Sequence, residues 1–305
     1  MTRRFTLFLL LFLLHPVVFA QTAQWSMLRD NTLHTLQAAV SRSSGIVGLA
    51  AIDLTSGETF GINDTLVFSQ GSAIKIPILM EVFKQARVGR FHLTDRKPVP
   101  HSVMVGGSGV LQYLGDGTSA MSIRDLSVLM IVLSDNTATN MLIDLVGMEN
   151  INRTLRSLGL LQTVVHRRMI DQAASARGNE NLSTPAEAAA IMKILYDGKF
   201  IDRATSAEIM EILLFGKSGG ISRGVPDSIR VAFKPGGIAG VSTEWAVVYL
   251  PQRPYVVTVM GNYLADEDAA GTIREISRTL FSYFWRRGFA TSFGTYVDPA
   301  LKESK

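Results

Sequence analysis

The apolar positions of the chain follow two kinds of pattern, and the kind changes along the sequence. Large apolar side chains recur at helical spacing at residues 24–41 and again at residues 73–88, which predicts two helices. Between them, residues 45–53 form a short apolar, β-prone run, and Ser56-Gly57 provides a turn before Thr59. We therefore expect the chain to begin with a helix, a β-hairpin and a second helix that is buried.

The middle of the chain is predicted to be helical, and its last third returns to strands. Helical patterns cover residues 126–133, 138–145, 151–158, 185–196 and 204–214. Strand-like runs, broken at residues 237–240 and 251–254, occupy residues 230–233, 243–250 and 255–261, and a closing helix covers 269–285. This order predicts an α/β fold: one antiparallel sheet built from both chain ends, flanked by the terminal helices, with an all-helical subdomain inserted at about 64–218. A cleft between the two parts is the default position for a site.

The first twenty residues differ in character from the rest. Two arginines precede an apolar run from Phe5 to Leu14, and small residues lead up to Ala20. This arrangement predicts a secretory signal peptide at residues 1–20, cleaved after Ala20. The alternative is a membrane anchor, but a spanning helix needs about 20 consecutive apolar residues, and this run is shorter. We therefore expect a single mature domain at 21–305, periplasmic or secreted, without a stable membrane anchor.

Composition and charge narrow the classes of function. The 305 residues are 47% hydrophobic and 18% charged, which is typical of a globular protein. The formal net charge of +4 includes the two arginines of the predicted signal peptide, and no dense basic run points to nucleic acid. Cysteine is absent, and the histidines lack metal-ligand spacing. We expect a monomer that uses neither a metal nor another cofactor.

A hydroxyl and an amine stand three residues apart at the start of the second predicted helix. Ser72 and Lys75 share one helix face, so the Lys75 amine can reach the Ser72 hydroxyl. A serine hydroxyl is a weak nucleophile, and a desolvated lysine beside another cation can lose its proton and act as its base. The backbone N–H groups at a helix start also favour a developing negative charge. Alone, however, a Ser-x-x-Lys pair can arise by chance in a chain of this length.

Two further motifs follow in order. Ser134-Asp-Asn136 lies between two predicted helices, and Lys234-Pro-Gly236 follows directly on a strand-like run. Singly, the first could be a helix-capping turn and the second a strand end. In this order and at these separations, however, the three motifs together predict a serine acyl-transfer site.

The three motifs resemble those of the class A β-lactamases and the wider superfamily of penicillin-recognising serine hydrolases. The similarity extends over essentially the whole mature sequence. It implies a β-lactamase/transpeptidase-like fold and an enzyme that is acylated at Ser72, with Lys75 as the partner base. It further implies that Ser134 relays a proton to the leaving nitrogen and that Asn136 hydrogen-bonds the substrate amide.

On the opposite wall of the cleft, the resemblance assigns three positions of the third motif. Lys234 is implied to line the cleft and supply positive potential. Gly236 belongs to the same substrate-binding motif, and Gly237 falls where the strand donates the second oxyanion N–H.

The chain departs from this family pattern near the substrate. Pro235 replaces the hydroxyl residue of the third motif, which removes a donor expected to hold the carboxylate of a β-lactam. Glu244 stands ten residues after Lys234, where many class A enzymes place an arginine, and Arg223 is our candidate to supply that charge instead.

The family's Glu-x-x-x-Asn pattern, which holds and activates the hydrolytic water, is missing before Ser183. Acylation needs groups that are all present, whereas deacylation needs a base for water. Asp171 is the nearest carboxylate and our candidate base, although an acid in such a loop can instead pair with Arg167. The remaining possibilities are that Lys75 serves both steps or that the acyl-enzyme accumulates.

The leading interpretation is an exported class A-type serine hydrolase that hydrolyses β-lactams, with a role in antibiotic resistance. One alternative is a penicillin-binding-like peptidase or esterase acting on cell-wall-derived amides or esters. Another is a slow-turnover ligand trap of the same fold. Turnover separates them, since an enzyme clears excess substrate and a trap stops at one equivalent.

Overall fold

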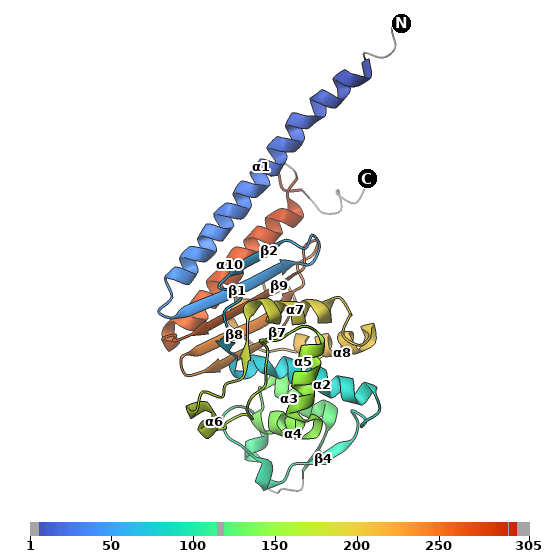
Figure 1. The fold of residues 1–305 in the computed structure, drawn as a ribbon, viewed down its shortest axis with the longest axis vertical. Helices are drawn as coiled ribbons and strands as arrows, with labels where there is room; N and C mark the ends of the chain where they lie inside the picture. The colour runs from blue at the N-terminus through green and yellow to red at the C-terminus, as the bar shows by residue number, and fades with distance from the viewer. Residues whose placement is uncertain (1–5, 115–118, 292, 298–305) are drawn as a thin grey trace.

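The computed structural model describes residues 6–114, 119–291 and 293–297, and its centre is a five-stranded antiparallel sheet (Figure 1). The strand order is β2-β1-β9-β8-β7, so the two hairpins from opposite ends of the chain meet where β1 pairs with β9. The strands are β1 (Ile46–Asp53), β2 (Thr59–Ile62), β7 (Val231–Ile238), β8 (Val241–Val248) and β9 (Tyr255–Asn262). The predicted sheet built from both chain ends is confirmed.

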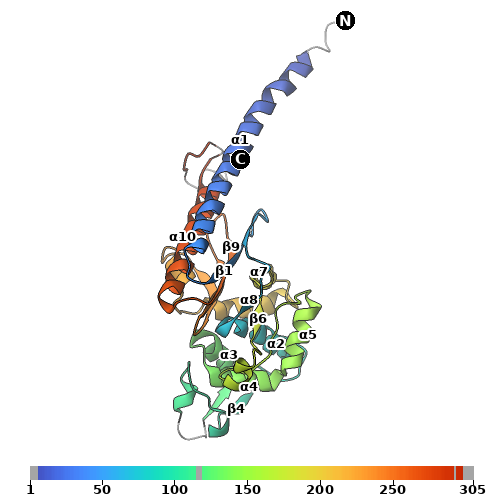
Figure 2. The ribbon, with the colours of Figure 1, turned by 60° about the vertical axis from the view of Figure 1, so that its left-hand side comes forward.

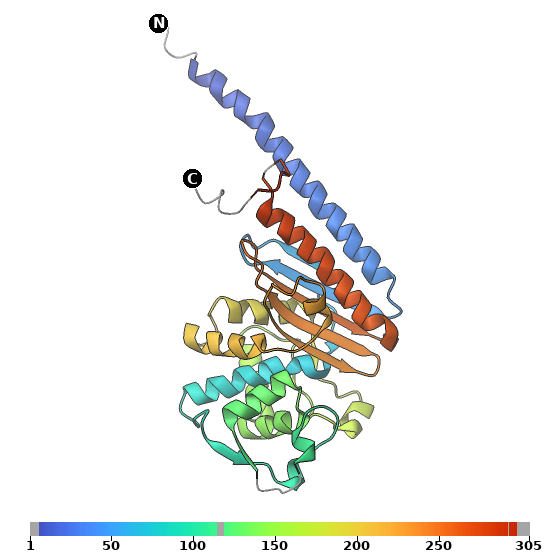
Figure 3. The same ribbon diagram turned by 180° about the vertical axis from the view of Figure 1, so that it is seen from behind.

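The two terminal helices lie side by side along one face of the sheet, as Figures 1 and 3 show. These are α1 (Thr6–Ser41) and α10 (Asp266–Phe289). Aromatic rings fill the layer between helix and sheet: Phe60 meets Tyr283 edge-on at 5.0 Å between centroids, and Tyr255 stacks on Phe284 at 4.5 Å. Such pairs add to the free energy gained by burying apolar surface.

The helices of the middle of the chain cover the other face and form a second core around α2 (Figures 1 and 2). Every side chain from Ala73 to Phe83 is buried, so this helix is enclosed on all sides up to its last turn. These helices are α2 (Lys75–Arg87), α3 (Ile123–Val132), α4 (Asn136–Val146), α5 (Met148–Ser157), α6 (Gln172–Ala176), α7 (Pro185–Tyr196) and α8 (Arg203–Leu214). The short helix α9 (Gly220–Arg223) instead packs against α10 in the core beneath the terminal helices. Short 3₁₀ turns are η1 (Gly71–Ile74), η2 (His101–Val103) and η3 (Leu111–Tyr113).

A buried glutamine joins the helical part to the sheet directly ahead of η1. Gln70 is 0% exposed, and its carbonyl accepts from Thr243 Oγ1 at 2.8 Å while its Oε1 accepts from Trp245 Nε1 at 3.0 Å. One short strand pair, β3 (Phe68–Ser69) with β6 (Leu182–Ser183), supports the same region, whereas a second, β4 (Arg96–Pro98) with β5 (Ala120–Ser122), lies at the end of the helical part away from the sheet (Figure 1). The start of α2 is thereby fixed against β8.

Most predicted elements are present, with differences at their ends. The strand expected to stop at Phe233 continues as β7 through Pro235 and Gly237 to Ile238, because β8 pairs with it over this whole length. The first helix begins at Thr6 rather than near residue 24 and runs unbroken to Ser41.

Two predictions about the organisation of the chain stay predictions. Residues 1–5 of the expected signal peptide lie outside the described residues, as do 115–118 of the expected subdomain and 298–305 of the expected domain. None of the helices within the described ranges is long and apolar enough to cross a bilayer.

Candidate active site

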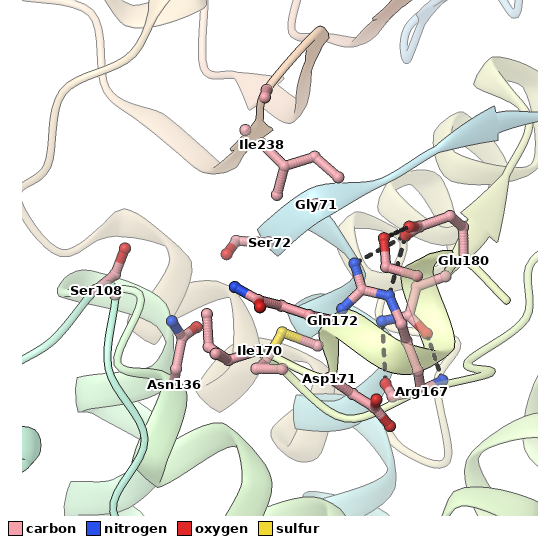
Figure 4. Close-up of a pocket in the computed structure, with 16 residues that line it drawn as sticks. Gly71, Ser72, Ser108, Asn136, Arg167, Ile170, Asp171, Gln172, Glu180 and Ile238 are labelled. Carbon is pink, nitrogen blue, oxygen red and sulfur yellow. Dashed lines mark hydrogen bonds and ion pairs between the residues drawn. The ribbon is translucent and has the colours of Figure 1, made fainter. Parts of the chain in front are cut away.

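Ser72 lies in the 3₁₀ turn η1, just before α2 begins, and faces a cavity of about 520 Å³. Its side chain is partly exposed, although the residues that follow it are buried. The cavity is lined by Gly71, Ser72, Gly107, Ser108, Asn136, Arg167, Met169, Ile170, Asp171, Gln172, Ser175, Glu180, Asn181, Gly237, Ile238 and Ala239 (Figure 4). A reactive hydroxyl on a rigid helix start, open to a cavity, is the arrangement that acyl transfer needs.

Lys75 lies behind Ser72 and is 0% exposed. Its ammonium donates to the Ser134 carbonyl at 2.8 Å, to Ser134 Oγ at 3.0 Å and to Asn136 Oδ1 at 2.9 Å. Burial, together with the nearby Lys234 ammonium, holds the pKa of Lys75 well below its ordinary value, against an opposing effect of Asp135. No hydrogen bond joins Lys75 to the Ser72 hydroxyl among the described residues. The structure therefore connects Lys75 directly to the second motif.

Ser134 receives hydrogen bonds from two lysines of different elements. Its Oγ accepts from Lys75 Nζ at 3.0 Å and from Lys234 Nζ at 3.2 Å. The residue has φ of +52°, a left-handed conformation that is uncommon outside glycine and costs about 1–3 kcal/mol. This hydroxyl is therefore held between two lysine side chains by a strained turn.

The rest of the second motif fixes this turn in place. Asp135 is 1% exposed and caps α4, with Oδ1 accepting from Ala138 N at 2.9 Å. Its other oxygen accepts from Val110 N at 2.7 Å and Leu111 N at 2.9 Å, which ties the loop over the cavity to α4. Asn136 adds a bond from Nδ2 to the Gly106 carbonyl at 3.1 Å. The interpretation of this motif as a capping turn is also correct for Asp135.

Lys234 belongs to β7 and is 1% exposed. Besides Ser134 Oγ, its Nζ bonds to the Pro235 carbonyl at 2.7 Å. Burial and the Lys217 ammonium lower the pKa of Lys234 to about 7, while Glu244 acts in the opposite direction. The protonation of Lys234 therefore depends on Lys217 and Glu244 as well as on its burial.

Gly236 on β7 and Gly71 in η1 allow the strand to approach the turn more closely than other residues would permit. A Cβ at Gly236 would lie 2.4 Å from the Gln70 carbonyl oxygen and 2.5 Å from Ala73 N. A Cβ at Gly71, which also has φ of +47°, would lie 2.8 Å from Gly237 N. The backbone of Gly237 is thus brought beside the turn that carries Ser72.

Two adjacent polar side chains of the loop before α6 point in opposite directions. In Figure 4 the Asp171 carboxylate points away from Ser72, and it caps α6 by accepting from Ala174 N at 2.9 Å. The Gln172 carboxamide points toward Ser72 and has no hydrogen-bond partner among the described residues. Ile170 before them has φ of +64°, a rare conformation for a β-branched residue. The sequence singled out Asp171, but the structure turns its neighbour toward the serine.

The other carboxylates near this loop already have partners. Arg167 does not pair with Asp171, as one interpretation allowed, but binds Glu180 Oε2 from Nη2 at 2.8 Å. Glu187 accepts from the backbone N–H groups of Leu161 and Thr163 at 2.8 and 2.7 Å. No carboxylate of the described residues 161–187 is therefore both unpaired and directed at Ser72.

Arg223 lies apart from this cavity. Its Nε donates to the Gly219 carbonyl at 3.1 Å, and its side chain lines a different cavity of about 400 Å³ with Lys217. The structure therefore does not place Arg223 on the lining of the Ser72 cavity.

Two residues that build the site were missed from the sequence. Asn140 clamps the backbone of Met169, accepting from its N–H at 2.8 Å and donating to its carbonyl at 3.1 Å. Its position four residues after Asn136 on the same helix face could have indicated a shared role. Gln172 carried no signal, because the direction of its side chain depends on the backbone of Ile170.

Comparisons with known proteins find similar sequences and similar solved structures. Residues 32–284 match the model of a family described as the beta-lactamase enzyme family. An imipenem-hydrolyzing beta-lactamase of Enterobacter cloacae is 27% identical over 225 residues, covering 71% of this chain and 76% of its own. A solved beta-lactamase structure from Sphaerobacter thermophilus has a TM-score of 0.77 and 29% identity, covering 84% of this chain and 97% of its own. A PBP-A variant with glutamate in place of leucine, in an acyl-enzyme complex with penicillin G, has a TM-score of 0.77 and 27% identity, with coverage of 84% and 97%.

Proposed function

This chain belongs to the beta-lactamase enzyme family and is a serine β-lactamase-like hydrolase, and from that premise we propose that it forms a covalent acyl-enzyme at Ser72. The observation that carries the proposal is the convergence of Lys75 and Lys234 on the Ser134 hydroxyl, beside a serine that opens into a cavity. Two buried lysine side chains that both hydrogen-bond to one hydroxyl form a path along which a proton can move.

Acylation requires one proton to leave Ser72 and one to reach the lactam nitrogen. The Ser72 oxygen attacks the lactam carbonyl, its proton passes to neutral Lys75, and the new oxyanion is held by the N–H groups of Ser72 and Gly237. The carbon–nitrogen bond then breaks, and the Ser134 hydroxyl delivers a proton to the nitrogen while it regains one from a lysine. The lowered pKa of Lys75 supports its role as the base, since only the neutral amine can accept the proton.

Deacylation is proposed to be the slow step. A water molecule needs a base, and the loop turns an amide, Gln172, rather than a carboxylate toward Ser72. Loss of a general base typically costs about 10²–10⁴-fold in rate. With the Asp171 carboxylate engaged at the start of α6, a long-lived acyl-enzyme follows, which favours the penicillin-binding or trapping alternative over rapid turnover.

The predicted export belongs to the same proposal. Cleavage after Ala20 leaves Gln21 as the first residue of a mature protein in the periplasm or outside the cell. Intact mass of the protein recovered from that compartment tests it, and a first residue upstream of Gln21 would contradict it.

Intact mass after mixing with penicillin G tests the acylation. We expect an adduct with the full mass of the drug, formed on the wild type, absent from Ser72→Ala and lost slowly once free drug is removed. Absence of an adduct on the wild type, or an adduct that persists on Ser72→Ala, would overturn the assignment of Ser72. An adduct that clears as fast as it forms would overturn slow deacylation alone.

A further inference from the structure

The lining of the Ser72 cavity offers no free positive charge. Among the described residues that line it, only Arg167, Asp171 and Glu180 are charged. Arg167 donates from Nε at 3.0 Å and Nη2 at 2.8 Å to Glu180, and from Nη1 at 3.2 Å to the Arg168 carbonyl. Its side chain is only 10% exposed. The one charge left on the lining is the carboxylate of Asp171.

The two lysines behind the cavity are engaged with protein atoms. Lys75 is 0% exposed and Lys234 is 1% exposed. Lys75 uses three donors on Ser134 and Asn136, and Lys234 uses two on Ser134 and Pro235. An anion entering the cavity would have to compete with these partners, and moving a charge into a buried site without a prepared partner is unfavourable.

On β7 and β8, Pro235 and Thr243 offer no free side-chain hydrogen-bond donor to a substrate carboxylate. Pro235 has neither a hydroxyl nor an N–H, and the Thr243 hydroxyl already donates to the Gln70 carbonyl at 2.8 Å. Next to Thr243, Glu244 is 5% exposed and accepts from the N–H groups of Gly220 and Ile221. Its negative charge lies close enough to Lys234 to offset part of the lysine's potential.

The remaining walls are apolar at their surface. Met169, Ile170 and Ile238 all line the cavity, and Ile170 and Ile238 are 46% and 41% exposed. Figure 4 shows Ile238 above Ser72 and Ile170 below it. An uncharged, apolar acyl donor would bury these side chains, whereas a substrate carboxylate would find no free cationic side chain to pair with.

These contacts lead us to propose that the Ser72 site selects acyl donors without a free carboxylate, namely neutral esters and lactams whose carboxylate is masked. The inference rests on the proposed acylation of Ser72 and adds the charge of the substrate. Pro235 and Glu244 are its specificity-determining residues, acting through the donors and the potential at the end of β7.

The test compares penicillin G with its methyl ester, in which a methyl group removes the negative charge of the carboxylate. The rate of adduct formation on Ser72 is followed by intact mass, and p-nitrophenyl butyrate is compared with mono-p-nitrophenyl succinate in a second pair. We expect each neutral member to react at least as fast as its charged partner. A charged member that reacts tenfold faster in either pair would overturn the inference. If only the two p-nitrophenyl esters react, the ratio of their rates still tests the charge preference, while the assignment of β-lactams as substrates fails. If none of the four compounds reacts, both proposals are contradicted.

A substitution on β7 tests the assigned residue. Pro235→Thr adds a hydroxyl and an N–H beside Lys234, and we expect it to shift the rate ratio about tenfold toward free penicillin G, since hydrogen bonds to charged groups are among the stronger ones. Pro251→Thr, the same change in an exposed turn after β8, is the control and should leave the ratio unchanged. An unchanged ratio in a folded Pro235→Thr variant would remove Pro235 from the proposal.

Discussion

The two sides of the Ser72 cavity are built by different means. On one side Lys75, Ser134 and Lys234 come from helix starts and a strand, are largely buried, and bond to one another. On the other side Asp171 and Gln172 belong to an exposed loop, where one caps a short helix and the other has no partner among the described residues. The groups assigned to bond making are thus fixed, and no group on the opposite side is prepared to activate water.

The comparison suggests that the two halves of the reaction can be changed separately. Residues that share hydrogen bonds are expected to be coupled, whereas Gln172 shares none with the lysines, so its substitution should leave acylation intact. Each of the following changes acts mainly on one side.

The largest effect is expected from Lys75→Met, which keeps the volume of the side chain and removes the amine. Acylation of Ser72 by penicillin G should fall by about 10²–10⁴-fold, because the base is lost. Stopped-flow or timed intact mass measures it, with Lys84→Met on the same helix as the control. Acylation at the wild-type rate in Lys75→Met would show that another group takes the proton.

Gln172→Glu should give the next largest effect, in the opposite direction. It places a carboxylate where the loop already points toward Ser72, and we expect deacylation to accelerate by about 10²-fold, the lower end for a general base. Decay of the penicillin adduct provides the rate. Asp171→Asn is the matched variant: it keeps the cap of α6 and should leave the decay unchanged, whereas a slower decay would restore Asp171 as the base.

The pH profile of acylation tests the buried lysines together. Lys75 must be neutral, so the rate should rise as pH passes the lowered pKa of Lys75, and Lys234 must be charged, so the rate should fall above its pKa of about 7. Above that value we expect about a tenfold loss per pH unit. Lys234→Arg stays charged and should move the falling limb to higher pH. A falling limb that stays in place in this variant would assign it to another group.

The smallest effect concerns stability on the rigid side. Gly236→Ala forces a Cβ against Gln70 and Ala73, and overpacking of this kind costs about 1–3 kcal/mol in the free energy of unfolding. Gly237→Ala, where the nearest atom to a Cβ is the Val241 carbonyl oxygen at 3.6 Å, should cost less. Thermal unfolding of both variants measures this difference in stability. Equal stabilities would mean that β7 moves away from η1 without penalty.

The two sides of the Ser72 cavity also differ in how well the sequence predicts them. The motif residues could be predicted because the order and separation of the three motifs indicate a serine acyl-transfer site, and because helical spacing puts Ser72 and Lys75 on one face. The continuation of β7 beyond Phe233 was missed, because Pro235 and Gly237 locally favour a break and only pairing with β8 overrides them.

The loop side could not be predicted in the same way. Which of Asp171 and Gln172 faces the serine depends on the positive φ of Ile170, a property of the folded backbone that no local pattern specifies. The partner of Arg167 is Glu180, thirteen residues further on, whereas the sequence favoured Asp171 because it is only four residues away.

The pairing of β1 with β9 constrains the order in which the elements can fold. Ile46 lies opposite Asn262, so the first strand of the protein waits for a partner that is synthesised more than two hundred residues later. The helices between them have near neighbours in sequence and can gather first, since contacts between close residues form faster than distant ones. A chain interrupted before β9 would leave β1 paired on one edge only, with its other edge open to unwanted partners. Completion of the sheet therefore belongs to the final stage of synthesis, when both termini are available to each other.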